Sequence, residues 1–289
     1  MPVEALRDIK ALTFDVFGTV VNWRESVESA LKESITSRSR SKSGTTTPHH
    51  LPTDLQRRAA ALTDEDYARL AQEWRDSYKR FTRSFRAGDD GTPWKDIDTH
   101  HHESLVALLE KWQLAGLYTN DDDAAEVKEL SLVWHRLQPW PDSARGIRQL
   151  GGGEEGKDED EEGLGLVTAT LSNGNHSLLA DLNDSGGLGF SRLISAEDFG
   201  VYKPDPKVYL GAAEKLGCAP GEVAMVAAHL NDLDAARKLG LRTIYVEREG
   251  EEDWSVDDER YQAAKEWVDL WIGLDGDGFI GVARALKSL

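Results

Sequence analysis

The sequence predicts an α/β protein whose core is a doubly wound parallel sheet, with a block of helices inserted into it. In the second half of the chain, short apolar segments alternate with helical ones. These segments read as continuous hydrophobic runs, as strands do when both faces of a parallel sheet are covered. A long region before them carries aromatic residues at helical spacing instead.

The first strand is predicted at ALTFDV, residues 11–16, and four further strands follow the helical block. They are LGLVTATL (164–171), SRLISA (191–196), EVAMVAA (222–228) and LRTIYV (241–246). Helices are predicted at DPKVYLGAAEKLG (205–217) and NDLDAARKLG (231–240), each closing on a glycine that suits a helix end. We expect the core to comprise residues 1–21 and 139–289.

The helical block is predicted over residues 22–138. Residues 62–85 place aromatic and leucine side chains three and four positions apart, which defines one face of a helix. Thr63 and Asp66 resemble a capping box at its start. Two further helices are predicted, followed by a break at PWPD; they are HHESLVALLEKWQL (101–114) and DDAAEVKELSLVWHRL (122–137). The three consecutive histidines at 100–102 are expected to be solvated, because adjacent residues fan around a helix.

Two segments offer almost no side chains to bury. Residues 34–52 are rich in serine, threonine and basic residues, and residues 151–163 consist almost entirely of glycine and acidic residues. Such composition is typical of solvated loops, so both are predicted to be disordered insertions. A regulatory or docking role for the basic segment is an alternative.

The net charge and composition of the chain restrict the partners and the compartment that we expect for it. The 289 residues carry a formal net charge of -18, which argues against binding the phosphate backbone of nucleic acids. A small anionic substrate is still allowed, because a few local cations outweigh a distant field. No apolar run is long enough for a membrane span, no secretory signal is evident, and the single Cys218 fits a reducing compartment. We expect a cytoplasmic protein without nucleic-acid or membrane partners, with a homodimer as a possible assembly.

Polar side chains follow four of the predicted strands. Because the carboxyl ends of parallel strands meet at one edge of the sheet, these side chains are expected to converge. Sites of nucleophilic catalysis combine such functional groups, namely a carboxylate, hydroxyls, an amide and a lysine. In chain order they are Asp15, Ser172 and Asn173, Lys203 and Tyr209, and His229 and Asp232.

Four motifs carry a family resemblance. FDVFGTVVNWR, LSNG, YKPDPKVY and AAHLNDLDAAR resemble, in order, the motifs of the haloacid dehalogenase superfamily, in particular its type II, L-2-haloacid dehalogenase branch. The resemblance covers the predicted core, about half of the chain. It implies a Rossmann-like core with a helical cap inserted after the first motif. It also implies hydrolysis of a 2-haloacid to a 2-hydroxy acid through an ester on the first aspartate, without a cofactor.

The resemblance also implies residue roles. Asp15 is the nucleophile, and Lys203 pairs with it, which keeps the carboxylate ionised. Ser172 is implied to hold the substrate carboxylate and Asn173 to lie near the leaving halide. Thr19 supplies a further hydrogen-bond donor near the substrate.

Three positions leave alternatives open. Tyr209 matches the family's spacing after the lysine, but a core aromatic residue on a helix is an equal alternative. Arg75, in EWRDSY, resembles the cap arginine that faces the leaving halide, and Arg24, in NWRESV, competes for that role. Exposed salt bridging is the alternative for both arginines.

The fourth motif departs from the family pattern. A Ser-Ser-Asn stretch precedes the aspartate in the family, whereas this chain has Ala-Ala-His at 227–229. His229 therefore stands where the asparagine is expected. A neutral histidine donates or accepts a hydrogen bond, so it can still position water. Asp232 is the candidate that orients or activates the hydrolytic water.

The residue at position 17 distinguishes phosphate-ester cleavage from carbon–halogen cleavage. Relatives that cleave phosphate esters carry a second aspartate at this position, which protonates an alkoxide leaving group. Halide leaves without a proton, so a phenylalanine favours carbon–halogen chemistry in a dry substrate pocket and argues against a phosphatase. No metal is expected, with a weak Mg²⁺ site on Asp15 and Asp232 as the alternative. A Mg²⁺-dependent phosphohydrolase and a catalytically silent binding protein are the alternatives. The backbone N–H groups of Phe17 and Gly18 are expected to donate to a bound carboxylate or oxyanion.

Overall fold

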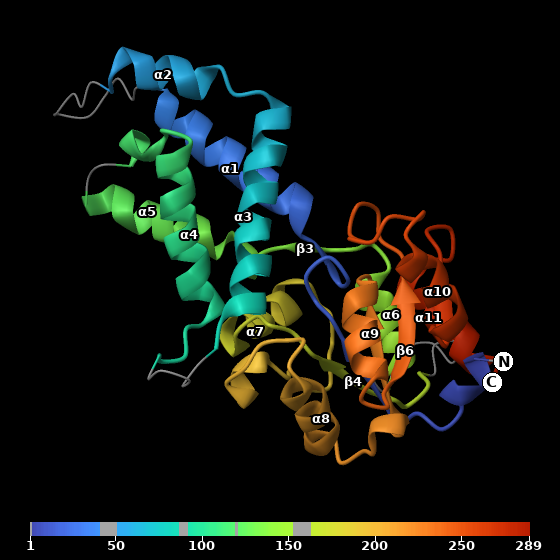
Figure 1. The fold of residues 1–289 in the computed structure, drawn as a ribbon. Helices are drawn as coiled ribbons and strands as arrows, with labels where there is room; N and C mark the ends of the chain where they lie inside the picture. Colours follow the sequence, from blue (N-terminus) through green and yellow to red (C-terminus); the bar gives the residue numbers. More distant parts are fainter. Residues whose placement is uncertain (1, 41–50, 87–91, 119–120, 153–162) are drawn as a thin grey trace. The chain divides into compact units, whose positions relative to one another are not determined.

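The computed structural model describes residues 2–40, 51–86, 92–118, 121–152 and 163–289 (Figure 1). The chain divides into two compact units. The first, an α/β core, comprises Met1–Asn22, Phe85–Trp94 and Gln138–Leu289, and the second, a helical cap, comprises Trp23–Ser84 and Lys95–Leu137. The predicted fold class, an α/β core with an inserted helical cap, is confirmed. Among the described helices, none is long and apolar enough to cross a membrane.

The core sheet is parallel throughout its described strands, in the order β4-β1-β5-β6-β7. Every residue of β1 and β5 is buried, as the hydrophobic runs predict for strands covered on both faces. Register places Phe14, at the end of β1, beside Thr170 of β4 and Val226 of β5. The strands are β1 (Ala11–Phe14), β4 (Val167–Thr170), β5 (Val223–Ala227), β6 (Arg242–Val246) and β7 (Leu270–Ile272).

One predicted strand did not form as expected. SRLISA makes only isolated bridges beside β4, from Arg192 to Ala169 and from Ser195 to Ser172. The hydroxyl of Thr170 accepts from the backbone N–H of Ile194 at 2.9 Å and donates to its carbonyl oxygen at 3.1 Å. In a regular sheet, these two groups of Ile194 would bond to main-chain partners on the neighbouring strand. The edge strand β7 was not predicted.

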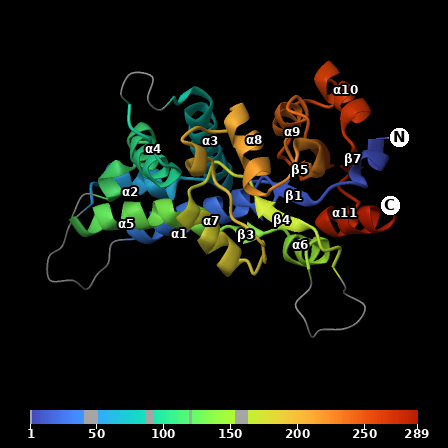
Figure 2. The ribbon, with the colours of Figure 1, turned by 90° about the horizontal axis from the view of Figure 1, so that it is seen from below.

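Helices cover both faces of the sheet, which is the doubly wound arrangement. In Figure 2, α6 and α11 lie on one side of the row of strands, and α8 and α9 lie on the other. Asp205 caps α8 by accepting a hydrogen bond from the backbone N–H of Lys207. The helices are α6 (Ser143–Leu150), α7 (His176–Ser185), α8 (Pro206–Lys215), α9 (Leu230–Arg237), α10 (Glu259–Trp267) and α11 (Gly278–Lys287).

Two short strands bring together the segments where the chain leaves and re-enters the core. β2 (Val21–Asn22) and β3 (Gln138–Pro139) pair antiparallel, with Val21 opposite Pro139. The insertion therefore begins and ends at neighbouring points of the core, directly after the loop that follows β1.

The cap contains the predicted helices. Tyr67, Leu70, Trp74 and Tyr78 are all buried on one face of α3. The capping box before α3 is also present, because Thr63 Oγ1 accepts from the N–H of Asp66 and Asp66 Oδ2 accepts from the N–H of Thr63. The helices are α1 (Trp23–Ser39), α2 (Thr53–Ala60), α3 (Asp64–Ser84), α4 (Ile97–Lys111) and α5 (Asp121–Ser131).

The predicted insertion at 34–52 was placed too early. Residues 34–39 continue helix α1, and Ile35 is fully buried, so this part of the segment does contribute to a core. The low hydrophobicity of the stretch concealed a single apolar residue at helical spacing from Leu31. Residues 41–50 and 153–162, which form most of the remaining predicted insertions, lie outside the described residues.

The expectation of solvated histidines at 100–102 was wrong for two of the three. His100 stacks on Phe81 with 4.2 Å between ring centroids, and His101 stacks on Trp134 at 4.4 Å. Burial lowers the pKa of His100 to about 4 and holds the pKa of His101 well below its usual value, so both rings are neutral at pH 7. These histidines behave as aromatic core residues of the cap.

A buried ion pair ties the loop after β1 to the rest of the core. Arg248 donates to both carboxylate oxygens of Asp142, at 2.6 and 2.8 Å, and its Nε donates to the carbonyl oxygen of Thr19 at 3.1 Å. Asp142 also accepts from the backbone N–H of Phe279 at 2.7 Å. Arg248 therefore connects the loop after β1 to the first turns of α6 and α11.

We expect Arg248→Met to lower the free energy of unfolding by about 3–5 kcal/mol, because Asp142 is left largely buried without its cation. Urea unfolding of the purified variant measures this loss. The control is Arg284→Met, which removes an exposed pair with Asp277 and is expected to cost less than about 1 kcal/mol. Equal losses in the two variants would contradict a structural role for the Arg248 pair.

Candidate active site

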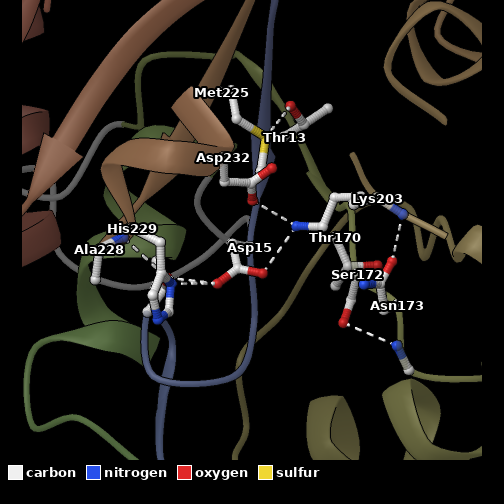
Figure 3. Close-up of polar contacts among 12 residues, drawn as sticks. Thr13, Asp15, Thr170, Ser172, Asn173, Lys203, Met225, Ala228, His229 and Asp232 are labelled. Atoms are coloured by element: carbon white, nitrogen blue, oxygen red, sulfur yellow. Dashed lines mark hydrogen bonds and ion pairs between the residues drawn. The ribbon is translucent and has the colours of Figure 1, made fainter. Parts of the chain in front are cut away.

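The polar residues predicted at the strand ends do converge within the core. β4, β1 and β5 are neighbours in the sheet, so the segments that follow them meet at one edge. Figure 3 shows Asp15 between Lys203 and His229, with Asp232 beside Asp15 and also within reach of the lysine ammonium. Within the sheet, the buried hydroxyl of Thr13 in β1 donates to the sulfur of Met225 in β5 at 3.3 Å.

Asp15 receives hydrogen bonds at both carboxylate oxygens. Lys203 Nζ donates to Oδ1 at 2.8 Å, while Thr19 Oγ1 donates to Oδ2 at 2.9 Å. His229 Nδ1 lies 3.1 Å from the same Oδ2. Burial raises the pKa of Asp15, but Lys203 and His229 outweigh it and hold this pKa well below its usual range. The carboxylate is therefore ionised and fixed in orientation.

Lys203 is held between two carboxylates. Besides Asp15, its Nζ contacts Asp232 Oδ2 at 2.6 Å, and its side chain is almost entirely buried. Burial lowers the pKa of Lys203, but the two carboxylates outweigh this effect and raise it above the ordinary value. Lys203 is therefore a permanent cation between Asp15 and Asp232.

Thr19 joins the loop after β1 to the end of β5. Its Oγ1 accepts from the backbone N–H of Ala228 at 2.9 Å while it donates to Asp15. The expectation that the Gly18 N–H is available to a ligand was wrong, since it donates to Val21 O at 3.0 Å in a tight turn. Gly18 has φ +84°, a conformation that favours glycine.

Asp232 and Tyr209 form a second, deeper contact. The Tyr209 hydroxyl donates to Asp232 Oδ1, and the tyrosine is fully buried. Burial and the adjacent carboxylate both raise the pKa of Tyr209, so it remains a neutral donor. Tyr209 therefore orients Asp232, and its buried hydroxyl is used for that contact.

Ser172 and Asn173 follow β4. The hydroxyl oxygen of Ser172 accepts from the Gly174 N–H at 3.1 Å, and Asn173 Oδ1 accepts from the backbone N–H of Lys203 at 2.8 Å. Asn173 thus fixes the main chain that carries the lysine. Phe17 is also buried, and its ring lies against Gly174.

Sequence reasoning missed one residue of this site. Glu251, in the loop after β6, is buried, and its Oε2 lies 3.6 Å from His229 Nε2, an ion-pair distance. Burial lowers the pKa of His229, but Asp15 and Glu251 outweigh it and raise this pKa to about 9. Glu251 is one of several acidic residues in the loop after β6, so the strand-end rule that selected Asp15 did not single it out.

Arg75 belongs to the cap, so its part in the site stays a prediction. Its guanidinium lies over the rings of Tyr78 and Trp23, at 4.7 and 5.7 Å from their centroids, and the residue is buried. Exposed salt bridging, the alternative for this arginine, is therefore wrong. The competing Arg24 lies over Trp23 at 4.4 Å and donates to Gln72 at 2.8 Å.

The two carboxylates of the site, Asp15 and Asp232, are both paired with Lys203. In the part of the chain that the structure describes, no group of three or more His, Cys, Asp or Glu side chains is arranged to hold one. The ammonium group of Lys203 lies between the carboxylates of Asp15 and Asp232, within 2.8 Å of both. The single positive charge of the lysine offsets one of the two negative charges, and His229 lies beside the other oxygen of Asp15.

The sequence matches the family model described as haloacid dehalogenase-like hydrolase over residues 9–240. The chain belongs to this family. Among curated relatives of this dehalogenase-like chain, the (S)-2-haloacid dehalogenase 4A of Burkholderia cepacia is 30% identical over 151 residues, covering 51% of this chain and 58% of that protein. The chain thus spans a little over half the length of the curated relatives it matches.

Two solved structures resemble this haloacid dehalogenase-like chain over nearly its full length. The crystal structure of a defluorinating L-2-haloacid dehalogenase is 28% identical, covers 96% of this chain and 95% of that one, and has a TM-score of 0.71. The crystal structure of another L-2-haloacid dehalogenase is 31% identical, covers 96% of this chain and 99% of that one, and has a TM-score of 0.68.

Proposed function

We propose that this protein hydrolyses a short 2-haloacid to the corresponding 2-hydroxy acid through a covalent ester on Asp15. The observation that carries the proposal is a largely buried, ionised carboxylate at a strand end, held by Lys203 and Thr19 at 2.8 and 2.9 Å. Such a carboxylate is a positioned nucleophile rather than a base, because its low pKa makes it a weak proton acceptor. The dehalogenase names of the relatives support the same reaction class.

In the first half-reaction, a carboxylate oxygen of Asp15 attacks C2 of the substrate in line with the carbon–halogen bond. The electron pair of that bond leaves with the halide, C2 is inverted, and an ester joins it to Asp15. Ser172 and the amide of Asn173 supply the predicted donors for the substrate carboxylate and the halide. Lys203 and Thr19 hold Asp15 in the attacking orientation.

In the second half-reaction, water attacks the ester carbonyl carbon of Asp15. The bond between this carbon and the oxygen on C2 breaks, so the product keeps an oxygen that belonged to the aspartate. Asp232, oriented by Lys203 and Tyr209, and His229, beside Asp15, are proposed to orient the attacking water. No proton is needed in the first step, which fits Phe17 two residues after the nucleophile.

Halide release from 2-chloropropionate and 2-bromopropionate tests the function. We expect turnover that persists in EDTA, because Lys203 supplies the positive charge beside Asp15. The matched assay uses phosphate monoesters with Mg²⁺ and the same enzyme preparation. Phosphate release that depends on Mg²⁺, without halide release, would establish the phosphohydrolase instead, and no turnover of either substrate class would favour a binding protein.

A further inference from the structure

Glu251 is a buried carboxylate for which the reaction described above has no role. His229 lies between it and Asp15, with Nδ1 3.1 Å from Asp15 Oδ2 and Nε2 3.6 Å from Glu251 Oε2. The three groups come from different elements, namely the loop after β1, the start of α9 and the loop after β6. Burial of an ionised carboxylate is costly unless a cation or hydrogen bonds compensate it, so this arrangement calls for an explanation.

The loop that carries the nucleophile is shaped to receive Glu251. A side-chain carbon on Gly18 would lie 2.1 Å from Glu251 Oε2, so a larger residue at this position would require Glu251 to move. Arg248, three residues before Glu251, donates to the carbonyl of Thr19 at 3.1 Å. Glu251 is thus packed on the turn after Asp15 and anchored to it through Arg248.

We propose that His229 and Glu251 form a proton relay for hydrolysis of the Asp15 ester, with Glu251 as the positioning residue for the imidazole ring. The proposal rests on the proposed function and assigns to His229 the proton transfers of its second step. In the free enzyme, the imidazolium of His229 lies between two carboxylates and cannot accept a proton.

Formation of the ester changes the charge around His229. Asp15 loses its negative charge, so of the two carboxylates in contact with the ring only Glu251 remains. With one carboxylate fewer to stabilise the imidazolium, the effect of burial is offset less, and the pKa of His229 falls from its raised value in the free enzyme. The ring releases one proton, and this is the proton that appears in the net reaction of haloacid and water to hydroxy acid, halide and H⁺.

The neutral ring then serves both proton transfers of hydrolysis. It accepts a proton from water as the water oxygen attacks the ester carbonyl carbon, and it delivers that proton to the departing alkoxide oxygen. Asp15 is left as a carboxylic acid that carries the water oxygen. Its proton passes to His229, which restores the initial ion pair, so atoms and charges balance over the cycle.

The other charges near the ring do not change during this cycle. Glu252 follows Glu251 and accepts from the backbone N–H of Leu230 at 2.7 Å, so it caps α9. Asp232, on the same helix as that N–H, is paired with Lys203 at 2.6 Å. Only Asp15 changes charge when the ester forms, and it therefore controls the state of His229.

The test is a single-turnover pH profile with 2-bromopropionate, comparing the native protein with Glu251→Gln. The halide burst measures ester formation and later hydroxy-acid release measures hydrolysis. We expect a burst of about one halide per active site in both proteins. Hydrolysis is expected to rise with pH as His229 becomes neutral, and Glu251→Gln should move the midpoint to lower pH by about one unit or more. The control Glu249→Gln makes the same change at an exposed position of the same loop and should not move it.

A second measurement needs no variant. With a pH indicator at about pH 8, between the ordinary pKa of histidine and the raised one, a proton should appear together with the halide and before the hydroxy acid. A midpoint unchanged by Glu251→Gln, or a proton that appears only with product, would overturn the relay while leaving the ester mechanism intact. If the native protein shows no halide burst, the proposed function fails and the relay fails with it.

Discussion

Asp15→Asn is expected to abolish halide release, with a loss of about four orders of magnitude or more, because the amide cannot displace a halide from carbon. The amide keeps the size of the side chain, and its one oxygen can still accept from either Lys203 or Thr19, so the fold should survive. Asp8→Asn, at an exposed aspartate ahead of β1, makes the same chemical change as a control and should be neutral.

Isotope placement separates the ester route from direct attack of water on C2. In ¹⁸O water with enzyme in excess, the ester route gives unlabelled hydroxy acid in the first turnover and ¹⁸O in the peptide that contains Asp15. Direct attack gives labelled product and an unlabelled peptide. Mass spectrometry of both species decides between the routes, and label in the first product would contradict the covalent mechanism.

Lys203→Met is expected to have the second largest effect, on stability and activity together. The ammonium group contacts Asp15 at 2.8 Å and Asp232 at 2.6 Å, and its removal leaves Asp232 without a cation and Asp15 with His229 alone. We expect the free energy of unfolding near pH 7 to fall by about 3–5 kcal/mol. Burial alone raises the pKa of Asp15, so the remaining activity should require a higher pH than in the native protein.

The control for this substitution is Lys207→Met on α8, where the lysine is exposed and a small change is expected. Urea unfolding measured at several pH values separates the two effects. For an aspartate whose pKa is held low by a partner, the stabilisation is present above the unfolded-state pKa and is lost as the pH falls. The stability difference between the native protein and Lys203→Met should therefore shrink in acid. A difference that does not depend on pH would indicate lost packing rather than lost charge pairing.

Local patterns were enough to predict the core and much of the site. Buried hydrophobic runs identified β1, β4, β5 and β6, and helical spacing identified α3, because burial imposes a period that a single sequence displays. Because parallel strands end at one edge of a sheet, Asp15, Lys203 and Asp232 were predicted to lie close together from the sequence alone. The absence of an acid at position 17, which is Phe17, was also informative. An alkoxide leaving group needs a proton from such an acid, whereas a halide does not.

Contacts between segments distant in sequence could not be inferred in this way. His100 and His101 read as solvated because adjacent residues fan around a helix, whereas stacking on Phe81 and Trp134 makes the neutral rings part of a core. Ile35 read as part of a disordered segment because its neighbours are polar, yet one buried side chain per turn keeps α1 intact. Glu251 read as one acid among several, and only the turn at Gly18 and the ring of His229 distinguish it. Local patterns report which residues are buried, but tertiary packing alone decides which buried charges face one another, because those partners lie more than twenty residues apart in the chain.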